Sequence, residues 1–186
     1  PVVTIGPVLD GDLAPLVEGG VTGSPTATFG VSSDDSADTL TCTVDGSPVD
    51  CSSGSAAVGP LSDGPHTFAA TATDTLGNQA SASFSWTIDT TAPALTVPVD
   101  ITVNEDGASG AAVVSFTATA TDLVDANPLV ACVPPSGSSF PVGTTTVDCT
   151  ATDAADNVSQ ASFTVTVVDT TAPALTVPVD ITVNED

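Results

Sequence analysis

The chain has 186 residues, of which 23 are acidic, one is histidine and none is lysine or arginine, so its formal net charge is −23. Nucleic acids and anionic membrane surfaces are bound through Lys and Arg, and the composition therefore excludes both as partners. Ion pairs within the chain are excluded too, except at His66.

Alternating apolar and polar residues, rich in Thr, Val, Ala and Ser, predict β-strands along the first half of the chain. The predicted strands are Val2–Ile5, Pro25–Val31, Leu40–Val44, Pro48–Cys51, Ala56–Val58, His66–Thr73 and Ala80–Ile88. Turn residues separate them, as in "DGS" and "SDGP". Phe68, Ala70 and Ala72 share one face of their strand, and Phe84, Trp86 and Ile88 share one face of the last strand. These six residues are the predicted core.

The second half repeats this plan, with Val147, Cys149 and Ala151 in the places of Phe68, Ala70 and Ala72, and with Phe163, Val165 and Val167 on the matching last strand. Its predicted strands are Ala94–Val97, Ile101–Asn104, Ala111–Thr121, Leu129–Val133, Ser139–Val142, Thr144–Thr152 and Ala161–Val168. No run of 18 apolar residues occurs, so we expect no segment inserted in a membrane. The fold class is predicted to be all-β, with tandem immunoglobulin-like β-sandwich domains in an end-to-end array.

The segment "DTTAPALTVPVDITVNED" occurs at 89–106 and again, unchanged, at 169–186. The copies start 80 residues apart, which is enough chain for a small core of its own. We therefore predict one domain over residues 1–88, a second over 89–169, and the first strand or strands of a following repeat over 170–186. The proline in each "DTTAP" favours an extended, semi-rigid connection.

The cysteines form two close pairs along the sequence, Cys42 with Cys51 and Cys132 with Cys149. Their even number, their local spacing and the lack of nearby histidine favour two disulfides over a metal site. Buried free thiols are the alternative. Disulfides imply an oxidising location, outside the cytoplasm.

The motif "ATDxxxN" occurs twice, with Asp74 and Asn78 and with Asp153 and Asn157. One interpretation is a tight turn held by the Asp and Asn side chains. The other is a calcium site, because carboxylates at domain ends can supply the oxygens that calcium requires. The candidate calcium ligands are Asp74, Asp89, Asp122, Asp125, Asp153, Asp156 and Asp169.

Two further polar residues, Asn157 and His66, are candidates for glycosylation and for catalysis, respectively. Asn157 begins an Asn-Val-Ser glycosylation sequon, which overlaps the predicted turn. His66 is either a general base or an ordinary strand residue, and the second fits its place beside Thr67 and Phe68. No Gly-x-Ser-x-Gly motif is present, and we predict that the protein is not an enzyme.

Residues 89–169 resemble a hyalin repeat (HYR) domain. The resemblance is carried by "PSGSSFPVGTTTVDCTATDAADNVSQASFTVTVVD" and "ALTVPVDITVNED". One departure is Val97–Pro98, where the family often has a cysteine. Residues 1–88 resemble a bacterial Ig-like repeat of large surface adhesins, through "LTCTVDGSPVDC", "LSDGPHTFAATATDTLGN" and "WTIDTTAP". That resemblance implies that the first two cysteines staple a hairpin.

Both resemblances imply a sandwich that acts outside the cell as a spacer or adhesion module. We therefore expect a structural repeat segment of a secreted or cell-surface protein, either an adhesin stalk or an extracellular filament. Its expected partners are neighbouring copies of the repeat, with a cell-surface or matrix ligand as a further candidate. The alternative is a binding module that recognises glycan or protein ligands through sandwich-end loops such as Val31–Thr39 and Asp122–Pro128.

Overall fold

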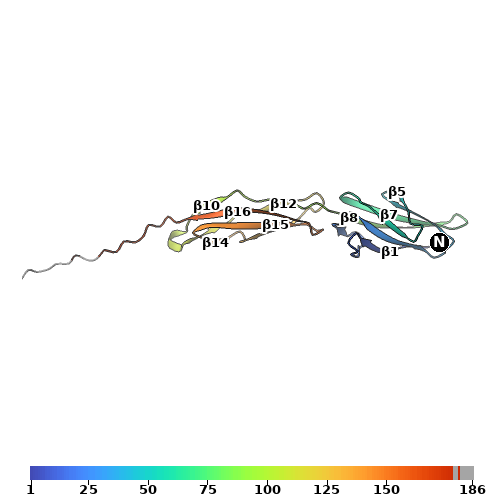
Figure 1. Ribbon diagram of the computed structural model, residues 1–186, viewed down its shortest axis with the longest axis horizontal. Coiled ribbons are helices and arrows are strands. Elements are labelled where there is room, and N and C mark those ends of the chain that lie inside the picture. The colour runs from blue at the N-terminus through green and yellow to red at the C-terminus, as the bar shows by residue number, and fades with distance from the viewer. Residues whose placement is uncertain (178–179, 181–186) are drawn as a thin grey trace, which may run out of the picture. The chain divides into compact units, whose positions relative to one another are not determined.

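The computed structural model describes residues 1–177 and residue 180, and within them the chain is almost entirely β-structure (Figure 1). Its strands are β1 (Val3–Asp10), β2 (Val21–Thr22), β3 (Ala27–Ser33), β4 (Thr39–Val44), β5 (Ser47–Val49), β6 (Ser55–Val58), β7 (Gly64–Thr73), β8 (Gln79–Ile88), β9 (Ala94–Thr96), β10 (Ile101–Asn104), β11 (Ala111–Val114), β12 (Thr119–Thr121), β13 (Leu129–Val133), β14 (Ser138–Pro141), β15 (Gly143–Thr152) and β16 (Val158–Val168). One 3-10 helix, η1 (Gly107–Ser109), precedes β11.

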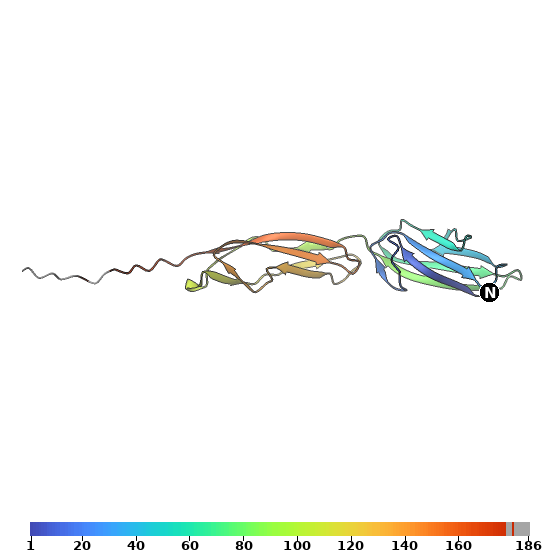
Figure 2. The same cartoon turned by 60° about the horizontal axis from the view of Figure 1, so that its bottom comes forward.

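The strands β1 to β8 form two sheets, one in the order β1-β3-β6 and one in the order β2-β8-β7-β4-β5 (Figure 2). Phe29 of the first sheet stacks on Phe68 of the second, with 4.2 Å between ring centroids, and also contacts Trp86. Each of these three rings is buried. The core therefore lies between two β-layers, as the alternating pattern predicted.

The predicted faces of β7 and β8 are confirmed. Phe68, Ala70 and Ala72 are completely buried, and Trp86 and Ile88 are buried on the neighbouring strand. Because side chains alternate across a strand, a period of two in the sequence suffices to identify the inward face.

The pattern missed one strand in this region and the length of another. β2 pairs in parallel with β8 over only Val21 and Thr22, which is too short to show periodicity. β1 continues to Asp10, past the predicted end, because the ladder to β3 resumes after an irregularity between Ile5 and Val8. Gly30 lies opposite that irregularity, where an added Cβ would come within 2.6 Å of the Gly6 carbonyl oxygen.

The strands β9 to β16 form a sheet in the order β10-β16-β15-β13 and two smaller pairs, β11-β14 and β12-β9. Their inward residues are buried in alternation, as predicted for β15 and β16. The buried hydrophobic residues are Ala112, Val114, Phe140, Val147, Cys149, Ala151, Phe163, Val165 and Val167. The predicted all-β sandwich class is thus confirmed.

The prediction of a single strand over Ala111–Thr121 is wrong. β11 pairs with β14 and β12 pairs with β9, so the chain changes partners between them. At the break, the Ser136 hydroxyl donates to the carbonyl of Phe116 and accepts from its amide, which satisfies both backbone groups outside a ladder. The Phe116 ring packs edge-on against Phe163. At the interruption, the bonds of a side chain 20 residues away therefore take the place of ladder bonds.

All four cysteines are disulfide-bonded, and the alternative of free thiols is wrong. Cys42 in β4 is bonded to Cys51, with 6.1 Å between their Cα atoms. This bridge closes the β4–β5 hairpin, in which Cys42 pairs with Val49. The hairpin staple implied by the resemblance to Ig-like repeats is confirmed.

The described chain packs into two compact units, each made of three separate segments. The first contains Pro1–Thr96, Ala118–Ala131 and Cys149–Ala161, and the second contains the intervening segments and the described residues from Ser162 onward. The boundaries 1–88 and 89–169 therefore remain a prediction. Within the predicted following repeat (170–186), residues 170–177 and 180 lie in no strand, and the others lie outside the described residues.

Candidate functional site

The two "ATDxxxN" motifs form the same turn. In the first, Asp74 Oδ1 accepts the amides of Leu76 and Asn78 at 2.8 and 2.9 Å, and Asn78 Nδ2 donates to Oδ2 at 2.7 Å. These bonds, with the Asn78 side chain first among them, lower the pKa of Asp74. Both oxygens of the Asp74 carboxylate are therefore hydrogen-bonded within the turn. The carboxylate lies in no cluster of acidic groups among the described residues.

The second turn repeats the bonds and adds one. Asp153 Oδ1 accepts the amides of Ala155 and Asn157 at 2.9 Å, and Asn157 Nδ2 donates to Asp153 Oδ2 at 2.9 Å. The same Nδ2 also donates to the backbone carbonyl of Asp89 at 2.8 Å. The turn interpretation of both motifs is therefore confirmed, and the second turn is attached to the chain just after β8.

Three carboxylates converge at this second turn. One oxygen each of Asp89, Asp122 and Asp153 can be chosen so that all lie within 4.8 Å of one another. Asp89 directly follows β8, Asp122 follows β12 and Asp153 follows β15, so three strand ends bring them together. All three residues belong to the first compact unit.

Asp89 is the most constrained member of this carboxylate cluster. Its side chain is 0% exposed, and its amide donates to the carbonyl of Thr22 in β2 at 2.9 Å. Oδ1 accepts the Thr91 amide at 3.3 Å, whereas Oδ2 is buried with no hydrogen-bond partner. Burial raises the pKa of Asp89 despite the Thr91 bond, and the negative charges of Asp122, Asp153 and Asp63 raise it further.

The other candidate ligands lie outside the cluster. Asp125 is half-buried, and its two oxygens accept the amides of Asn127 and Ala154 at 2.8 and 3.0 Å. Asp156 and Asp169 are exposed. The structure therefore brings together three of the seven predicted calcium ligands.

Asp63 is a site residue that the sequence did not reveal, because "SDGP" indicated only a turn. Its Oδ1 accepts the amide and the hydroxyl of Thr90 at 2.9 and 2.7 Å, and its Oδ2 accepts the Thr91 hydroxyl at 2.6 Å. These bonds, led by those from Thr91 and Thr90, lower the pKa of Asp63. The connection that follows β8 is thus held by the turn before β7.

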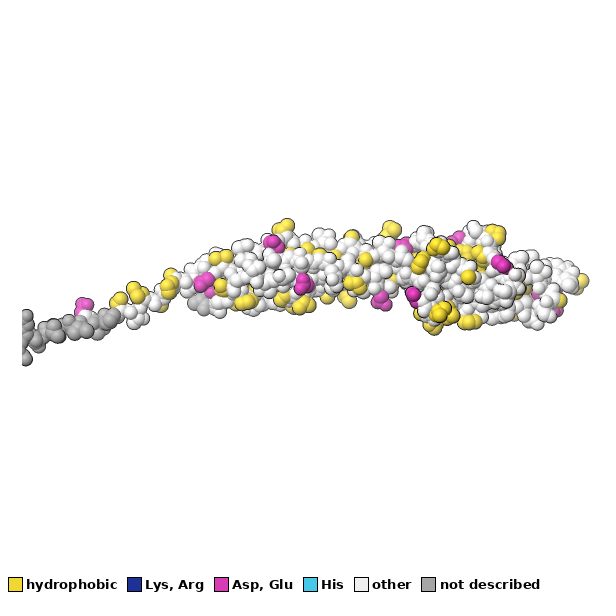
Figure 3. Space-filling model, viewed as in Figure 1, with side chains coloured by type: hydrophobic (Ala, Val, Ile, Leu, Met, Phe, Trp, Pro, Cys, Tyr) yellow, Lys and Arg dark blue, Asp and Glu magenta, His cyan; other side chains and the backbone are white. Residues whose placement is uncertain are grey.

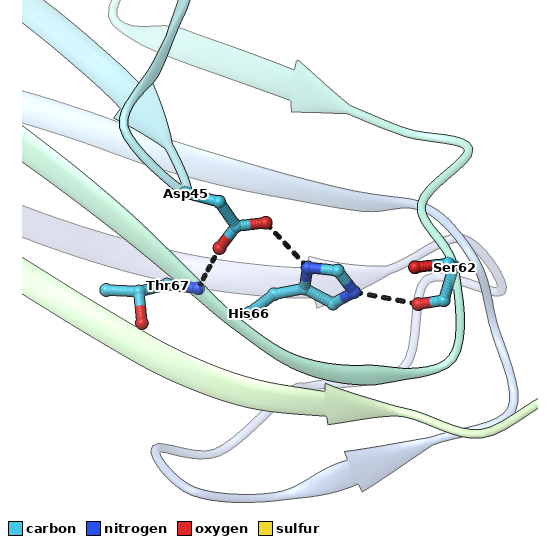
Figure 4. A network of polar contacts seen from close by, with 4 residues as sticks. All are labelled: Asp45, Ser62, His66 and Thr67. Atoms are coloured by element: carbon cyan, nitrogen blue, oxygen red, sulfur yellow. Dashed lines mark hydrogen bonds and ion pairs between the residues drawn. The ribbon is translucent and has the colours of Figure 1, made fainter.

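His66 forms the one ion pair found in the described part of the chain (Figure 4). Its Nδ1 lies 2.7 Å from Asp45 Oδ2, and its Nε2 lies 2.7 Å from the carbonyl oxygen of Ser62. Burial opposes protonation of the ring, but these bonds outweigh it and raise the pKa of His66. Asp45 also accepts the Thr67 amide at 2.9 Å. The histidine therefore connects two turns, as a structural residue does.

The proposed glycosylation site coincides with the second turn. Asn157 Nδ2 is the atom that a glycan would modify, and it donates to Asp89 and Asp153. A glycan there would compete with both bonds. Glycosylation of Asn157 remains a prediction.

Of the two predicted recognition loops, one lies beside a cavity and the other binds backbone amides with its acidic side chains. Residues around the Val31–Thr39 loop line an open cavity of about 360 Å³, formed by Ser33, Asp35, Ser36, Asp38, Thr39, Leu40 and Ser52. In the Asp122–Pro128 loop, Asp122 and Asp125 bind backbone amides instead. On the face seen in Figure 3, acidic side chains lie singly among uncharged ones. No helix within the described residues has the length and apolar character needed to cross a membrane.

The strand order and the converging turns define an all-β sandwich protein with acidic strand ends. Comparison with known proteins finds a family match in the second half of the chain. Residues 88–167 match the HYR domain family. The predicted HYR resemblance is therefore confirmed, whereas the bacterial Ig-like repeat over 1–88 remains a prediction.

Two curated proteins to which the chain is similar are hyalins. Hyalin of Strongylocentrotus purpuratus is 41% identical over 113 residues, which cover 56% of this chain and 9% of the hyalin. Hyalin of Lytechinus variegatus is 37% identical over 113 residues, covering 56% and 21%. The chain thus spans a small part of both relatives.

Among solved structures, the fibronectin(III)-like modules of Clostridium thermocellum CbhA are similar at 13% identity and a TM-score of 0.42, covering 90% of this chain and 94% of theirs. The extracellular cadherin domains 3–6 of protocadherin gamma B2 are similar at 15% identity and a TM-score of 0.41, covering 90% and 49%.

Proposed function

We propose that this chain is a structural repeat segment of a secreted or cell-surface adhesion-type protein, and that it acts as a semi-rigid spacer. The HYR match over 88–167 and the similarity to hyalins support an extracellular repeat module. Disulfide-bonded cysteines agree with an oxidising location. The net charge of −23 keeps neighbouring chains apart unless cations screen it.

The observation that carries the spacer proposal is the short connection between β8 and β9. The Asp89 amide is bonded to Thr22, and Thr90 and Thr91 are both bonded to Asp63. Pro93, at the end of the connection, is fully buried. A segment with these contacts has lost most of the freedom of a flexible tether, and so it transmits orientation along the chain.

Small-angle X-ray scattering tests this proposal on the 186-residue chain and its Asp63→Ala variant. The proposal predicts that the wild type fits a narrow set of conformations and that Asp63→Ala broadens it, because both threonines lose their acceptor. Asp50→Ala is the matched control, since Asp50 accepts hydrogen bonds from the nearby Ser52, two residues away. A wild type as broadly distributed as Asp63→Ala would contradict the spacer role.

A second candidate function is recognition of a glycan or protein by the Val31–Thr39 loop, and the cavity beside it is the observation that favours this. A glycan array separates the two functions. Binding that is lost in Asp35→Ala, which lines the cavity, and kept in Asp50→Ala would support recognition. An array without any bound glycan favours the spacer.

A further inference from the structure

We propose that Asp89, Asp122 and Asp153 together bind one calcium ion. Their carboxylate oxygens lie within 4.8 Å of one another at three strand ends. Independently of this proximity, the fully buried Asp89 side chain has one oxygen, Oδ2, without any hydrogen-bond partner. Buried polar atoms are nearly always satisfied, and a buried carboxylate oxygen without a partner, in a residue clustered with two other carboxylates, indicates a site for a cation.

The chain itself has no cation to offer this cluster. It contains no lysine or arginine, and its single histidine is engaged by Asp45. Asp63, which adds to the negative field at Asp89, is occupied by its two threonines. Burying a carboxylate without a counter-charge is costly, so an ion from solution is the available partner.

The ligand chemistry favours calcium. The cluster offers oxygen and neither sulfur nor nitrogen, which suits a hard cation. Calcium accepts six to eight oxygens in adaptable geometry, whereas magnesium requires a near-ideal octahedron and loses its water reluctantly. Three carboxylates on separate turns form an irregular set, whose remaining positions water would complete.

The three side chains are already oriented for such a site. Asp122 Oδ1 accepts the amides of Val124 and Asp125 at 2.8 and 2.9 Å, and Asp153 Oδ1 accepts two amides of its own turn. Asp89 Oδ1 is likewise bonded to the Thr91 amide. In each residue Oδ1 is held by backbone amides, while Oδ2 of Asp153 accepts Asn157 Nδ2 and Oδ2 of Asp89 has no hydrogen-bond partner in the protein. Preorganisation of this kind reduces the ordering cost of binding.

The bound ion would join the segment after β8 to the turns after β12 and β15. The inference goes beyond the spacer proposal and does not depend on it, since a calcium site is compatible with either candidate function. If calcium binds, the connection that starts at Asp89 gains a cross-link in addition to its bonds to Thr22 and Asn157.

Isothermal titration calorimetry of the intact chain with calcium, and separately with magnesium, tests the inference. Extracellular calcium modules bind at about 10⁻⁴–10⁻³ M, so we expect one site in that range. Asp89→Asn and Asp122→Asn should each weaken binding by about tenfold or more, whereas Asp74→Asn, in the matched turn, should leave it within about twofold. Two cluster variants are used so that a folding defect in one does not decide the test.

Absence of calcium binding by the wild type would overturn the proposal, and so would equal binding by wild type and both cluster variants. Magnesium binding as tight as calcium binding would contradict the assignment of the metal. None of these three results bears on the scattering of Asp63→Ala, which tests the spacer separately.

Discussion

The two turns at Asp74–Asn78 and Asp153–Asn157 have the same local structure and different surroundings. Each follows a long strand, and in each the Asp accepts two backbone amides and the Asn side chain bonds back to the Asp. Asp74 is partly exposed and belongs to no cluster of acidic groups among the described residues. Asp153, by contrast, is 6% exposed and lies beside Asp89 and Asp122.

This comparison separates what a short motif determines from what the fold adds. The bonds of the turn lie within five consecutive residues, and the turn forms at both occurrences of the motif. The carboxylate cluster depends on the ends of β8 and β12, which lie far from Asp153 along the sequence. An identical motif can therefore be purely structural in one place and part of a candidate metal site in another.

The largest expected effect comes from replacing the Asp that begins each turn, Asp153 in one variant and Asp74 in another. In saturating calcium, Asp153→Ala should lower the free energy of unfolding by about 4 kcal/mol, because it removes turn bonds and an ion ligand together. Asp74→Ala should cause a clearly smaller loss, which calcium does not change. Urea denaturation with and without calcium measures both, and equal losses in the two turns would show that their surroundings do not matter.

The second prediction concerns calcium and the buried carboxylate. Calcium at about 100 times its dissociation constant should stabilise the wild type by about 2.7 kcal/mol. Asp89→Asn should gain almost nothing from calcium, yet in chelator it should unfold at a higher temperature than the wild type, because it removes a buried charge that Asp122 and Asp153 repel. Calorimetric melting in calcium and in chelator measures this reversal, and a variant less stable in both conditions would contradict it.

The third prediction sharpens the comparison with Asp45, a carboxylate that does have a cationic partner. The folded-state pKa of His66 is raised above 6.5, so the stability from its protonated form is complete below that pH and is lost as pH rises through the folded pKa. His66→Gln should cost about 1–2 kcal/mol at pH 5.5 and less at pH 8.5.

Unfolding curves of wild type and His66→Gln across this pH range give the difference directly. Although burial opposes ionisation of Asp45, the bonds from His66 and Thr67 lower its pKa below 3.8. Its contribution is therefore lost only as pH falls through that lower value, well outside the tested range. A difference that does not shrink from pH 5.5 to 8.5 would contradict the ion pair.

The smallest expected effect separates the two asparagines. Asn157→Ala removes bonds to both Asp153 and Asp89, and should cost about 1 kcal/mol. Asn78→Ala removes only the bond to Asp74 and should cost less. Thermal unfolding of the two variants in calcium measures the order, and a larger loss in Asn78→Ala would contradict the attachment of the second turn to Asp89.

The sequence predicted the features that depend on local periodicity. Alternation identified the buried faces of β7, β8, β15 and β16, and close spacing identified the disulfide-bonded cysteines. It failed where distant residues decide, as at Phe116, whose backbone is bound by Ser136. β2 is held by two pairs with β8 and leaves no pattern of its own.

The same limit applies to the candidate site. Seven acidic residues near predicted strand ends were plausible calcium ligands, and the sequence contained nothing to rank them. Burial of Asp89 and its proximity to Asp122 and Asp153 arise from the packing of three strand ends. Asp63 gave no signal at all, because its threonine partners lie on the far side of β7 and β8 along the sequence.

A crystal structure of the chain grown in calcium tests the central claim most directly. The account predicts one calcium ion, identified by its anomalous scattering, at about 2.3–2.6 Å from oxygens of Asp89, Asp122 and Asp153, with none at Asp74. A cluster that holds only water, or an ion bound at the Asp74 turn instead, would contradict it.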